Sequence, residues 1–592
     1  MTSPAFEVFF AALPLFVVGV LLVGLLWPAA RVMPIAWLVA CAVGFFVWGM
    51  PPAWLLAATI EGVITAVQIL FIVFAALVLL YTMLRSGAFD TLNRNFAEIS
   101  EDRRVQVVLV AFFLATFIEG AAGFGTPAAV VAPLLLGLGF PALAAVVVAL
   151  IGHVIAVTYG AVGTPILVGI GEPMSSVSGI RTAIEANGMT TTEFAVEVAT
   201  WAATYHVLVG VVMPLFAVGM VVYFFGGEER SLQPAWEVAP LCLVSGVAFA
   251  IPYWLAARVS AAFPALLGSM LGGAVVIAAL RAGYFEPETH WEFPPESEWP
   301  DHWVGTIRPA DARGVIPNEY TISPLRAWTP YVLLILSLVI TRSVAPISRF
   351  LQGETIRPLG TEISLRFGTI TTEVGAFTLG LFGFEWTSIL GTEIGNGVGV
   401  AYLPGTWLLV SAVVAIPLFE MSRGQVAEAW REACLNLRSP LVALVFVLAM
   451  AHVMLQSGAH AVGLDSMIVV LATATADAVG PAYPFVAALI GALGAALMGS
   501  NTVSNITFGT FQFVAAESVG VPRTLIVGAQ AVGGAIGNLV AIHNVVAALA
   551  TVGLVGQEGR VMRLNLLPLL YYSAGVGLLA MLFSYVLFAG LF

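Results

Sequence analysis

The chain alternates long apolar runs with short polar segments along its whole length. A helix needs about 20 apolar residues to cross the roughly 30 Å hydrocarbon core of a bilayer, and most of the runs reach that length. The pattern therefore predicts an all-α polytopic membrane protein. The twelve full spans predicted lie at approximately 8–27, 33–50, 60–84, 142–170, 195–225, 236–257, 262–281, 329–347, 402–420, 439–456, 522–550 and 565–590.

Two further apolar segments are interrupted by glycine and polar residues. In the first, Phe117–Pro127 reads Phe-Ile-Glu-Gly-Ala-Ala-Gly-Phe-Gly-Thr-Pro, and each flanking arm is too short for a full span. We expect a re-entrant hairpin over 105–139, which enters from the cytoplasm and turns near mid-membrane. A second hairpin is expected over 483–518, with its tip at 499–505. Irregular backbone at this depth is stable only when it is buried in protein or lines a polar cavity, so the two turns predict a cavity.

A short repeat relates the two halves of the chain. Leu84–Ala88 (Leu-Arg-Ser-Gly-Ala) recurs as Leu455–Ala459 (Leu-Gln-Ser-Gly-Ala), and a glycine-bearing break follows each of them. The predicted repeats are 1–226 and 329–592, each with five spans and one hairpin. The linking segment, 227–328, holds two spans and a polar cytoplasmic loop. An odd number of spans then separates the repeats, which makes them inverted, and inverted repeats with broken helices are typical of secondary transporters.

The charges add an orientation and exclude some functions. All 22 basic residues are arginine, and the net charge is −12. Arginines in short loops favour the cytoplasmic side. With both termini outside, 15 of the 22 arginines fall inside, and four of the exceptions lie in one stretch, 342–372. The acidic balance argues against nucleic-acid binding, and the lack of a P-loop motif argues against ATP-driven transport.

Glu119 is the candidate proton carrier. An ionised carboxylate at mid-membrane depth costs about several kcal/mol unless it is paired, so Glu119 should be protonated or partnered. The alternative is a structural carboxyl that caps the hairpin through backbone N–H groups. His153 is assigned to proton coupling as well, because histidine titrates near neutrality. The alternative for His153 is a hydrogen-bonded core histidine.

The helix that returns from each turn begins with free N–H groups and a partial positive charge, which can hold an anion without an arginine. Such a site suits one carboxylate better than two. Two interrupted spans, at 153–165 and 530–544, are expected to add backbone carbonyls. The residues at the breaks are candidate substrate contacts, and each has an alternative role. The alternatives are helix capping, backbone conformation and, for the histidine, core packing. These candidate substrate contacts are Gly123, Gly125, Thr126, Ser500, Asn501, Thr502, Ser504, Asn505, His543 and Asn544.

The stretch Phe117–Gly125, taken with Gly499–Asn505, resembles the L-lactate permease family, the lactate/glycolate:proton symporters. Leu325–Pro330 and Val552–Gly556 match as well, and the resemblance covers essentially the whole chain. It implies import of L-lactate, glycolate or a related 2-hydroxymonocarboxylate by proton symport with alternating access. It also implies the elevator-type architecture of the ion-transporter superfamily and a homodimer in the cell membrane.

The chain departs from the family pattern at binding-site positions. Asn501 stands where the family often has an aspartate, and Ala541–Asn544 (Ala-Ile-His-Asn) replaces a more usual Ser-Pro-Gln-Ser. The histidine pair His153 and His543 offers a substitute for the missing acid. The coupling ion is therefore open at this stage.

Sodium coupling is the alternative within transport, because carbonyl, Ser, Thr and Asn oxygens at the breaks can bind Na⁺ without a carboxylate. An intramembrane protease that uses Glu119 with a histidine is the alternative from another class, but it does not require an inverted repeat. The sequence thus predicts a transporter without enzymatic activity, metal site or cofactor, whose partners are a small carboxylate and membrane lipids. Glu61, His206 and His452 lie in other spans and are interpreted as interfacial or helix-packing residues.

Overall fold

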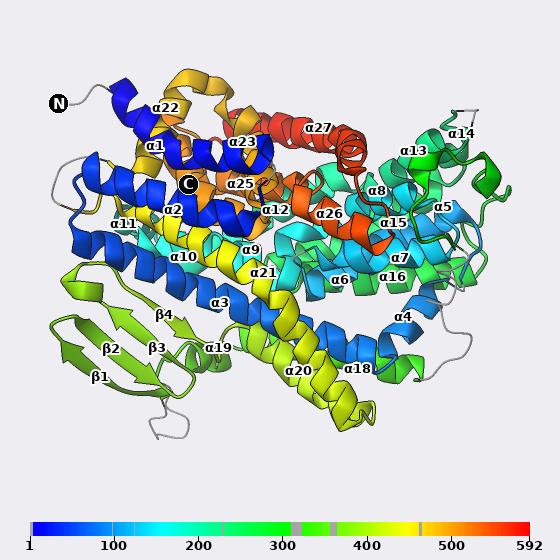
Figure 1. The fold of residues 1–592 in the computed structure, drawn as a ribbon, viewed down its shortest axis with the longest axis horizontal. Helices are drawn as coiled ribbons and strands as arrows, with labels where there is room; N and C mark the ends of the chain where they lie inside the picture. Colours follow the sequence, from blue (N-terminus) through cyan, green and yellow to red (C-terminus); the bar gives the residue numbers. More distant parts are fainter. Residues whose placement is uncertain are drawn as a thin grey trace.

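The computed structural model describes residues 4–25, 27–97, 99–123, 125–227, 230–309, 322–355, 364–460 and 465–592. Phe124 of the first predicted turn and residues 310–321 of the predicted cytoplasmic loop lie outside this part. Within the described part the chain is mainly helical (Figure 1). It has 11 helices long and apolar enough to cross a membrane, or up to 13 when each of two bent pairs is counted as a span. The predicted multi-pass helical architecture is confirmed at this level.

The helices of the first part of the chain vary from single turns to one of 34 residues. In chain order they are α1 (Pro4–Val18), η1 (Gly19–Gly24), α2 (Ala29–Phe46), α3 (Pro52–Arg85), α4 (Ala88–Ala97), α5 (Arg103–Gln106), η2 (Val107–Leu114), α6 (Ala115–Ala121), α7 (Thr126–Gly137), α8 (Ala142–Gly152), η3 (Val154–Tyr159), α9 (Gly160–Leu167), α10 (Gly171–Ser176), α11 (Ser178–Ala186), α12 (Thr191–Gly210) and α13 (Met213–Phe225).

The rest of the chain adds a small sheet to the helices. Its main elements are α14 (Gln233–Glu237), α15 (Ala239–Ala257), α16 (Pro264–Arg281), α18 (Pro324–Ser343), α19 (Ala345–Leu351), β1 (Arg366–Thr372), β2 (Gly375–Gly380), β3 (Gly383–Thr387), β4 (Asn396–Gly399), α20 (Pro404–Leu418), α21 (Arg423–Gln456), α22 (Met467–Val479), α23 (Tyr483–Met498), α24 (Asn501–Val519), α25 (Arg523–Gly537), α26 (Ile542–Thr551), α27 (Glu558–Leu582) and η10 (Phe583–Leu587).

Several predicted spans differ in detail. The predicted span 142–170 is divided among α8, η3 and α9. The predicted span 195–225 is the pair α12 and α13, bent by 42°. The predicted span 402–420 is the 15-residue helix α20, which is shorter than a full crossing. Glycine and proline inside each apolar run explain these interruptions, because both residues weaken a continuous helix.

Each of the two predicted hairpins consists of two helical arms separated by a break. In the first, α5, η2 and α6 follow without a gap from 103 to 121, and α7 comes after the break. This first arm has 19 residues and is itself long enough to cross a membrane, so it is longer than predicted. In the second hairpin, α23 and α24 pack against each other across a break at Gly499 and Ser500. A re-entrant course through the bilayer stays a prediction for both, as do the inverted repeats.

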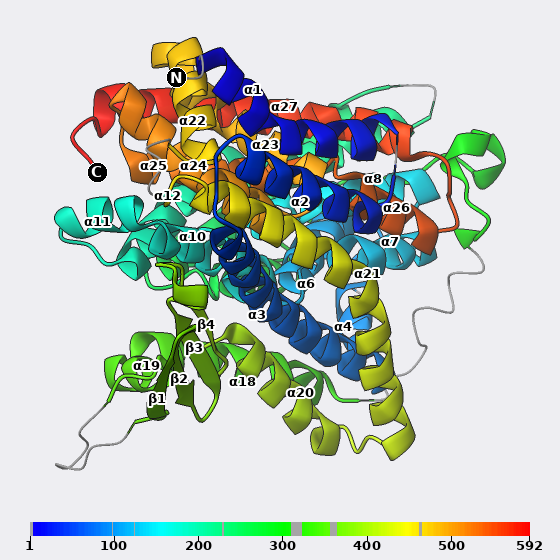
Figure 2. The ribbon, with the colours of Figure 1, turned by 60° about the vertical axis from the view of Figure 1, so that its left-hand side comes forward.

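The prediction of an all-α chain is wrong over 366–399. Four antiparallel strands in the order β1-β2-β3-β4 form a sheet there. It lies on the flank of the helical body, beside α3, in both views (Figures 1 and 2). The strands are short and rich in Thr, Phe and Trp, which favour strands, and glycines at their ends permit tight connections. Phe377 on β2 stacks on its cross-strand partner Trp386, with ring centroids 4.6 Å apart.

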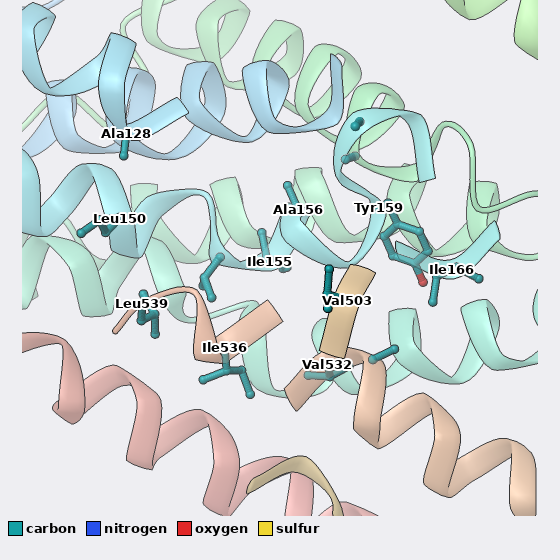
Figure 3. Close-up of a cluster of buried hydrophobic side chains, with 14 of the residues drawn as sticks. Ala128, Leu150, Ile155, Ala156, Tyr159, Ile166, Val503, Val532, Ile536 and Leu539 are labelled. Atoms are coloured by element: carbon teal, nitrogen blue, oxygen red, sulfur yellow. The ribbon is translucent and has the colours of Figure 1, made fainter. Parts of the chain in front are cut away.

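The core brings the two interrupted regions of the chain together. The continuous helix from 103 to 121 and the helix α25 are buried along their length except at their first residues, Arg103 and Arg523. Ile155, Ala156 and Tyr159 of η3 lie in one apolar cluster with Val503 of α24 and Val532 of α25 (Figure 3). Helices so thoroughly buried lie inside the bundle, where unwound backbone can be enclosed by protein.

Candidate functional site

The first break is built by two glycines and a hydroxyl. Gly123 and Gly125 have φ values of 62° and 77°, a left-handed conformation that glycine adopts without steric cost. Thr126 Oγ1 donates to Gly123 O at 2.7 Å and closes the turn. Pro127 follows in the first turn of α7, where its missing N–H is not needed. The hydroxyl of Thr126 is thus used inside the break.

The second break has a similar construction. Gly499 ends α23 with a φ of 76°, and Ser500 Oγ accepts from Val503 N at the start of α24. The ring of His543 lies directly against Gly499, so that a Cβ at this position would collide with it. Asn501 Nδ2 lies 3.4 Å from Val157 O, whereas its Oδ1 is buried without a hydrogen-bond partner.

Both interrupted spans are confirmed. After η3 the backbone turns through left-handed values at Ala161, Val162 and Gly163, with φ values of 43°, 57° and 82°. Non-glycine residues rarely adopt such values, and the surrounding structure must hold them there. Asn505 Nδ2 of the second hairpin donates to Pro165 O at 2.9 Å, directly after this turn. The other interruption separates α25 from α26 at residues 538–541.

The breaks open onto one cavity of about 880 Å³. The remaining walls come from the N-terminal helices, α21 and the start of α27, and they are mostly apolar. No arginine lines the cavity within the part of the chain that the structure describes. Eight of the predicted site residues line it: Glu119, Gly123, Gly125, Ser500, Asn501, Thr502, His543 and Asn544.

Four predicted site residues are not among those that line the cavity. Thr126 is used in the first break, and Asn505 reaches the unwound turn. Ser504 Oγ donates to Gly491 O at 2.9 Å, which ties α24 to α23. His153 Nδ1 lies 2.7 Å from Ala149 O, and it must be the donor because a carbonyl only accepts. For His153 this contact fits the alternative role of a hydrogen-bonded core histidine.

Glu119 is enclosed but unpaired. Its side chain is 4% exposed, and it makes no hydrogen bond or ion pair to any other described residue. Its Oε1 lies against Gly160 at the start of α9, where a Cβ would collide with the oxygen. The capping alternative would require a hydrogen bond from a backbone N–H to the carboxyl. None of the described residues makes such a bond.

The comparisons with known proteins decide the family. Residues 7–587 match the model of the L-lactate permease family. The chain belongs to the L-lactate permease family. A putative L-lactate permease of Haemophilus influenzae is 27% identical over 540 residues, which cover 90% of each chain. The resemblance predicted from the sequence is therefore confirmed.

Two further comparisons concern a glycolate permease and a solved structure of an efflux pump. The glycolate permease GlcA of Escherichia coli strain K12 is 26% identical over 562 residues, 92% of this chain and 90% of that one. Among solved structures, the Neisseria gonorrhoeae efflux pump MtrF aligns over 87% of this chain and 81% of that one. The TM-score is 0.41 and the identity 13%, and this likeness is too weak to support an argument. Family membership makes the chain a multi-pass membrane permease and not an enzyme.

Among the helices that begin at the cavity, three follow its breaks. They are α7, α24 and α26, whose first residues lie at or beside its wall. A helix start carries unbonded N–H groups and about half a positive charge, so the three together create a positive potential without a basic side chain. Anions are therefore favoured in this part of the cavity.

Two amide side chains of the site, both within the predicted interrupted span 530–544, were not predicted as contacts from the sequence. Asn538 lines the cavity with a buried Oδ1 that has no hydrogen-bond partner. Gln530 supports the second break from behind, because its Nε2 donates to Ser504 Oγ at 3.1 Å. Gln512 Nε2 in turn donates to Gln530 Oε1 at 3.0 Å. The available signal was an uncharged amide inside an otherwise apolar run, next to a predicted interruption.

Proposed function

We propose that this permease imports L-lactate, or a related 2-hydroxymonocarboxylate such as glycolate, by proton symport. The observation that carries the proposal is the enclosed, unpaired carboxyl of Glu119 in the same cavity as three helix N-termini. Keeping a carboxylate ionised in such a place costs roughly several kcal/mol of free energy. Glu119 is therefore protonated whenever the cavity closes around it, which is the behaviour of a proton carrier.

The substrate carboxylate binds at the helix starts. Backbone N–H groups at the beginning of α24, with the side chains of Ser500 and Thr502, supply donors to the anion. The absence of an arginine from the described cavity wall suits a single carboxylate better than a dicarboxylate. His543 and Asn544 offer donors and acceptors for the 2-hydroxyl group, and the apolar walls accept the rest of a small carbon skeleton.

Coupling follows from electrostatics. A proton on Glu119 removes a negative charge that would repel the substrate, and a bound anion in turn favours the protonated carboxyl. The cavity reaches Trp27–Ala30 and Glu558–Met562, which the arginine pattern assigns to the cytoplasm. We infer that the present arrangement faces inward and that alternating access moves the two breaks together to the other side. The homodimer that the family resemblance implies is part of the same proposal.

The test is uptake of radiolabelled L-lactate by proteoliposomes, with proton and sodium gradients imposed separately. Glu119→Gln keeps the size of the side chain but cannot carry a proton. We expect proton-driven accumulation to be lost while lactate/lactate exchange survives, because exchange needs no net proton movement. Glu558→Gln is the matched control, since Glu558 lines the same cavity and its hydrogen bond within the described part of the chain is the one it accepts from Gly556 N. Equal accumulation by Glu119→Gln and the wild type would refute the assignment.

Sodium coupling is the second candidate, and one observation favours it. The Oδ1 atoms of Asn501 and Asn538 are both buried without a hydrogen-bond partner, and both residues line the cavity. Neutral amide oxygens are suitable ligands for a hard cation. Uptake that depends on sodium at fixed pH, and is lost in Asn501→Ala and Asn538→Ala, would favour this candidate over proton symport.

A further inference from the structure

A second cavity, of about 550 Å³, lies between the sheet and the helices. It shares no lining residue with the substrate cavity, and its floor on the helix side includes His452 of α21. By the arginine pattern, the sheet and this cavity lie on the outer face, opposite the mouth of the substrate cavity. The charged and titratable residues that line it are Glu172, Arg181, Arg366, Glu385, Glu393 and His452.

His452 is paired with a buried carboxyl from α3. Glu61 and His452 are 0% and 1% exposed, and Glu61 Oε2 lies 3.2 Å from His452 Nδ1. Gln456 Nε2 donates to the same Oε2 at 3.0 Å. Glu61 Oε1 is buried without a hydrogen-bond partner. Close packing of α3 on α21 brings the pair together, because a Cβ at Gly62 would lie 2.6 Å from Ala449 Cα.

The hydrogen bonds around the pair leave two of its atoms without a partner. Thr65 donates its only hydroxyl hydrogen to Glu61 O at 3.2 Å. The Thr65 oxygen then accepts from Asn396 Nδ2 at 2.9 Å and from His452 Nε2 at 3.3 Å, so Nε2 carries a hydrogen. His452 Nδ1 and Glu61 Oε2 would both be acceptors and would repel each other without a further proton. Neither His452 Nδ1 nor Glu61 Oε1 has a hydrogen-bond partner among the described residues, so two atoms of the pair are open to a proton.

The barrier between the two cavities is thin at this point. Val447 lines the substrate cavity and His452 lines the second cavity, and both belong to α21. Five residues of helix correspond to about 8 Å along the axis. Glu172 interacts electrostatically with both Glu61 and His452 from the other wall. The pair thus lies at a place where the two cavities approach each other along α21.

We propose that Glu61 and His452 form a second proton-binding site of the permease, loaded from the cavity beside the sheet. The inference rests on the proposed proton symport and adds the place where the proton is taken up. Three carboxylates and two arginines face this cavity, and Arg366 is paired with Glu385 at 3.3 Å. The remaining negative charge favours protons over anions. The incoming proton binds between the unpartnered Oε1 of Glu61 and the unpartnered Nδ1 of His452, which lies 3.2 Å from Glu61 Oε2.

The test compares Glu61→Gln with the wild type in proteoliposomes, with the pH varied on each side in turn. We expect lactate/lactate exchange to stay within about twofold, while proton-driven uptake falls about a hundredfold, the lower range for loss of a proton-transfer group. The remaining uptake should no longer depend on pH at the sheet side. Glu61→Asp, which keeps a titratable carboxyl, should restore part of the uptake with a shifted pH profile.

Gln68→Leu is the matched control. Gln68 also lies on α3 and bonds the sheet, through Gly397 O at 2.7 Å, but it cannot titrate. We expect its pH profile to equal that of the wild type. A structural role for Glu61 would instead make Gln68→Leu and Glu61→Gln alike, with exchange and proton-driven uptake lowered in parallel. That result, or a wild-type pH profile in Glu61→Gln, would overturn the inference.

The outcomes separate this inference from the proposed function. If Glu119→Gln loses proton-driven uptake and Glu61→Gln keeps it, proton symport stands and the second site falls. If only Glu61→Gln loses it, the role given to Glu119 falls and the second site stands. Should Glu61→Gln fail to fold, His452→Gln, which retains a donor for Thr65, is read by the same criteria.

Discussion

Gly160 leaves the space that the Glu119 carboxyl occupies. A Cβ at position 160 would collide with Glu119 Oε1. The backbone directly after Gly160 is strained, because Ala161 and Val162 have positive φ values. The site therefore depends on a small residue in one interrupted span as much as on the carboxyl in the other.

Gly160→Ala should displace the carboxyl without removing it. A shift of about 1 Å in a reacting group can cost about a hundredfold in rate, so we expect proton-driven uptake to fall between about tenfold and a hundredfold. Gly171→Ala is the control, because the nearest atom to its added Cβ would be 3.8 Å away. Lactate uptake in proteoliposomes measures both, and wild-type uptake by Gly160→Ala would contradict this view of the site.

Glu119 illustrates what the sequence could and could not provide at this scale. A lone carboxylate beside glycines in an apolar run was enough to identify it as a candidate. The same reasoning predicted that His153 takes part in proton coupling with Glu119. In the structure, however, His153 bonds a carbonyl of its own helix. One apolar run offers no information about which face of a broken helix a side chain occupies, so the two residues were indistinguishable from the sequence.

The polar chain behind the second break stabilises the elements that form the cavity. Gln530 on α25 joins Gln512 and Ser504 of α24, so Gln530→Leu leaves buried groups unsatisfied. Each such group costs about 1–3 kcal/mol. We expect a clear loss of thermal stability in detergent, while Gln352→Leu, at an exposed position of the chain, should unfold like the wild type. Equal unfolding temperatures for all three proteins would show that the chain of amides is dispensable.

Buried charges anchor the start of the first hairpin. Arg104 bonds Asp102 at 2.8 Å and Glu237 of α14 at 2.8 Å. Burial raises the pKa of Asp102, but hydrogen bonds from Arg104 and Trp291 N and the charge of Arg104 lower it more, so the net pKa is below its ordinary value. Stability from this group is present above the unfolded-state pKa of about 3.9 and is lost as the pH falls through the folded-state value.

Asp102→Asn should remove this contribution and leave Arg104 buried with one carboxylate fewer. We expect the variant to unfold at a lower temperature than the wild type at pH 7. The difference should shrink below about pH 4, where Asp102 of the unfolded wild type is protonated. Thermal unfolding between pH 3 and pH 7 checks this expectation, and a difference that grows on acidification would contradict it.

The elements also show why some predictions failed. The breaks were predictable because Gly, Pro and polar residues stand out in apolar runs. The first arm of the hairpin was placed too short because Arg103 and Arg104 read as a polar boundary, whereas Arg104 is 0% exposed and bonded on all sides. The sheet was missed because its short glycine-flanked strands carry too little periodicity to be recognised.

At the scale of the whole molecule, the two cavities face opposite sides if the arginine pattern is right. Val555, 78% exposed near the substrate cavity, is then cytoplasmic, and Phe367, 71% exposed on the sheet, is outside. In a variant whose Cys41, Cys242 and Cys434 are replaced by serine, Phe367→Cys should react with a membrane-impermeant maleimide in intact cells. Val555→Cys should react only after the cells are opened. Equal labelling of both from outside would contradict the topology.

The central claim is that lactate and a proton move together through a cavity that contains Glu119. The most direct measurement adds L-lactate to sodium-free proteoliposomes that hold a pH-sensitive dye and have no imposed gradient. The account predicts acidification of the interior by the wild type and none by Glu119→Gln, even though that variant still exchanges labelled lactate. Lactate uptake without acidification, or undiminished acidification by Glu119→Gln, would contradict it.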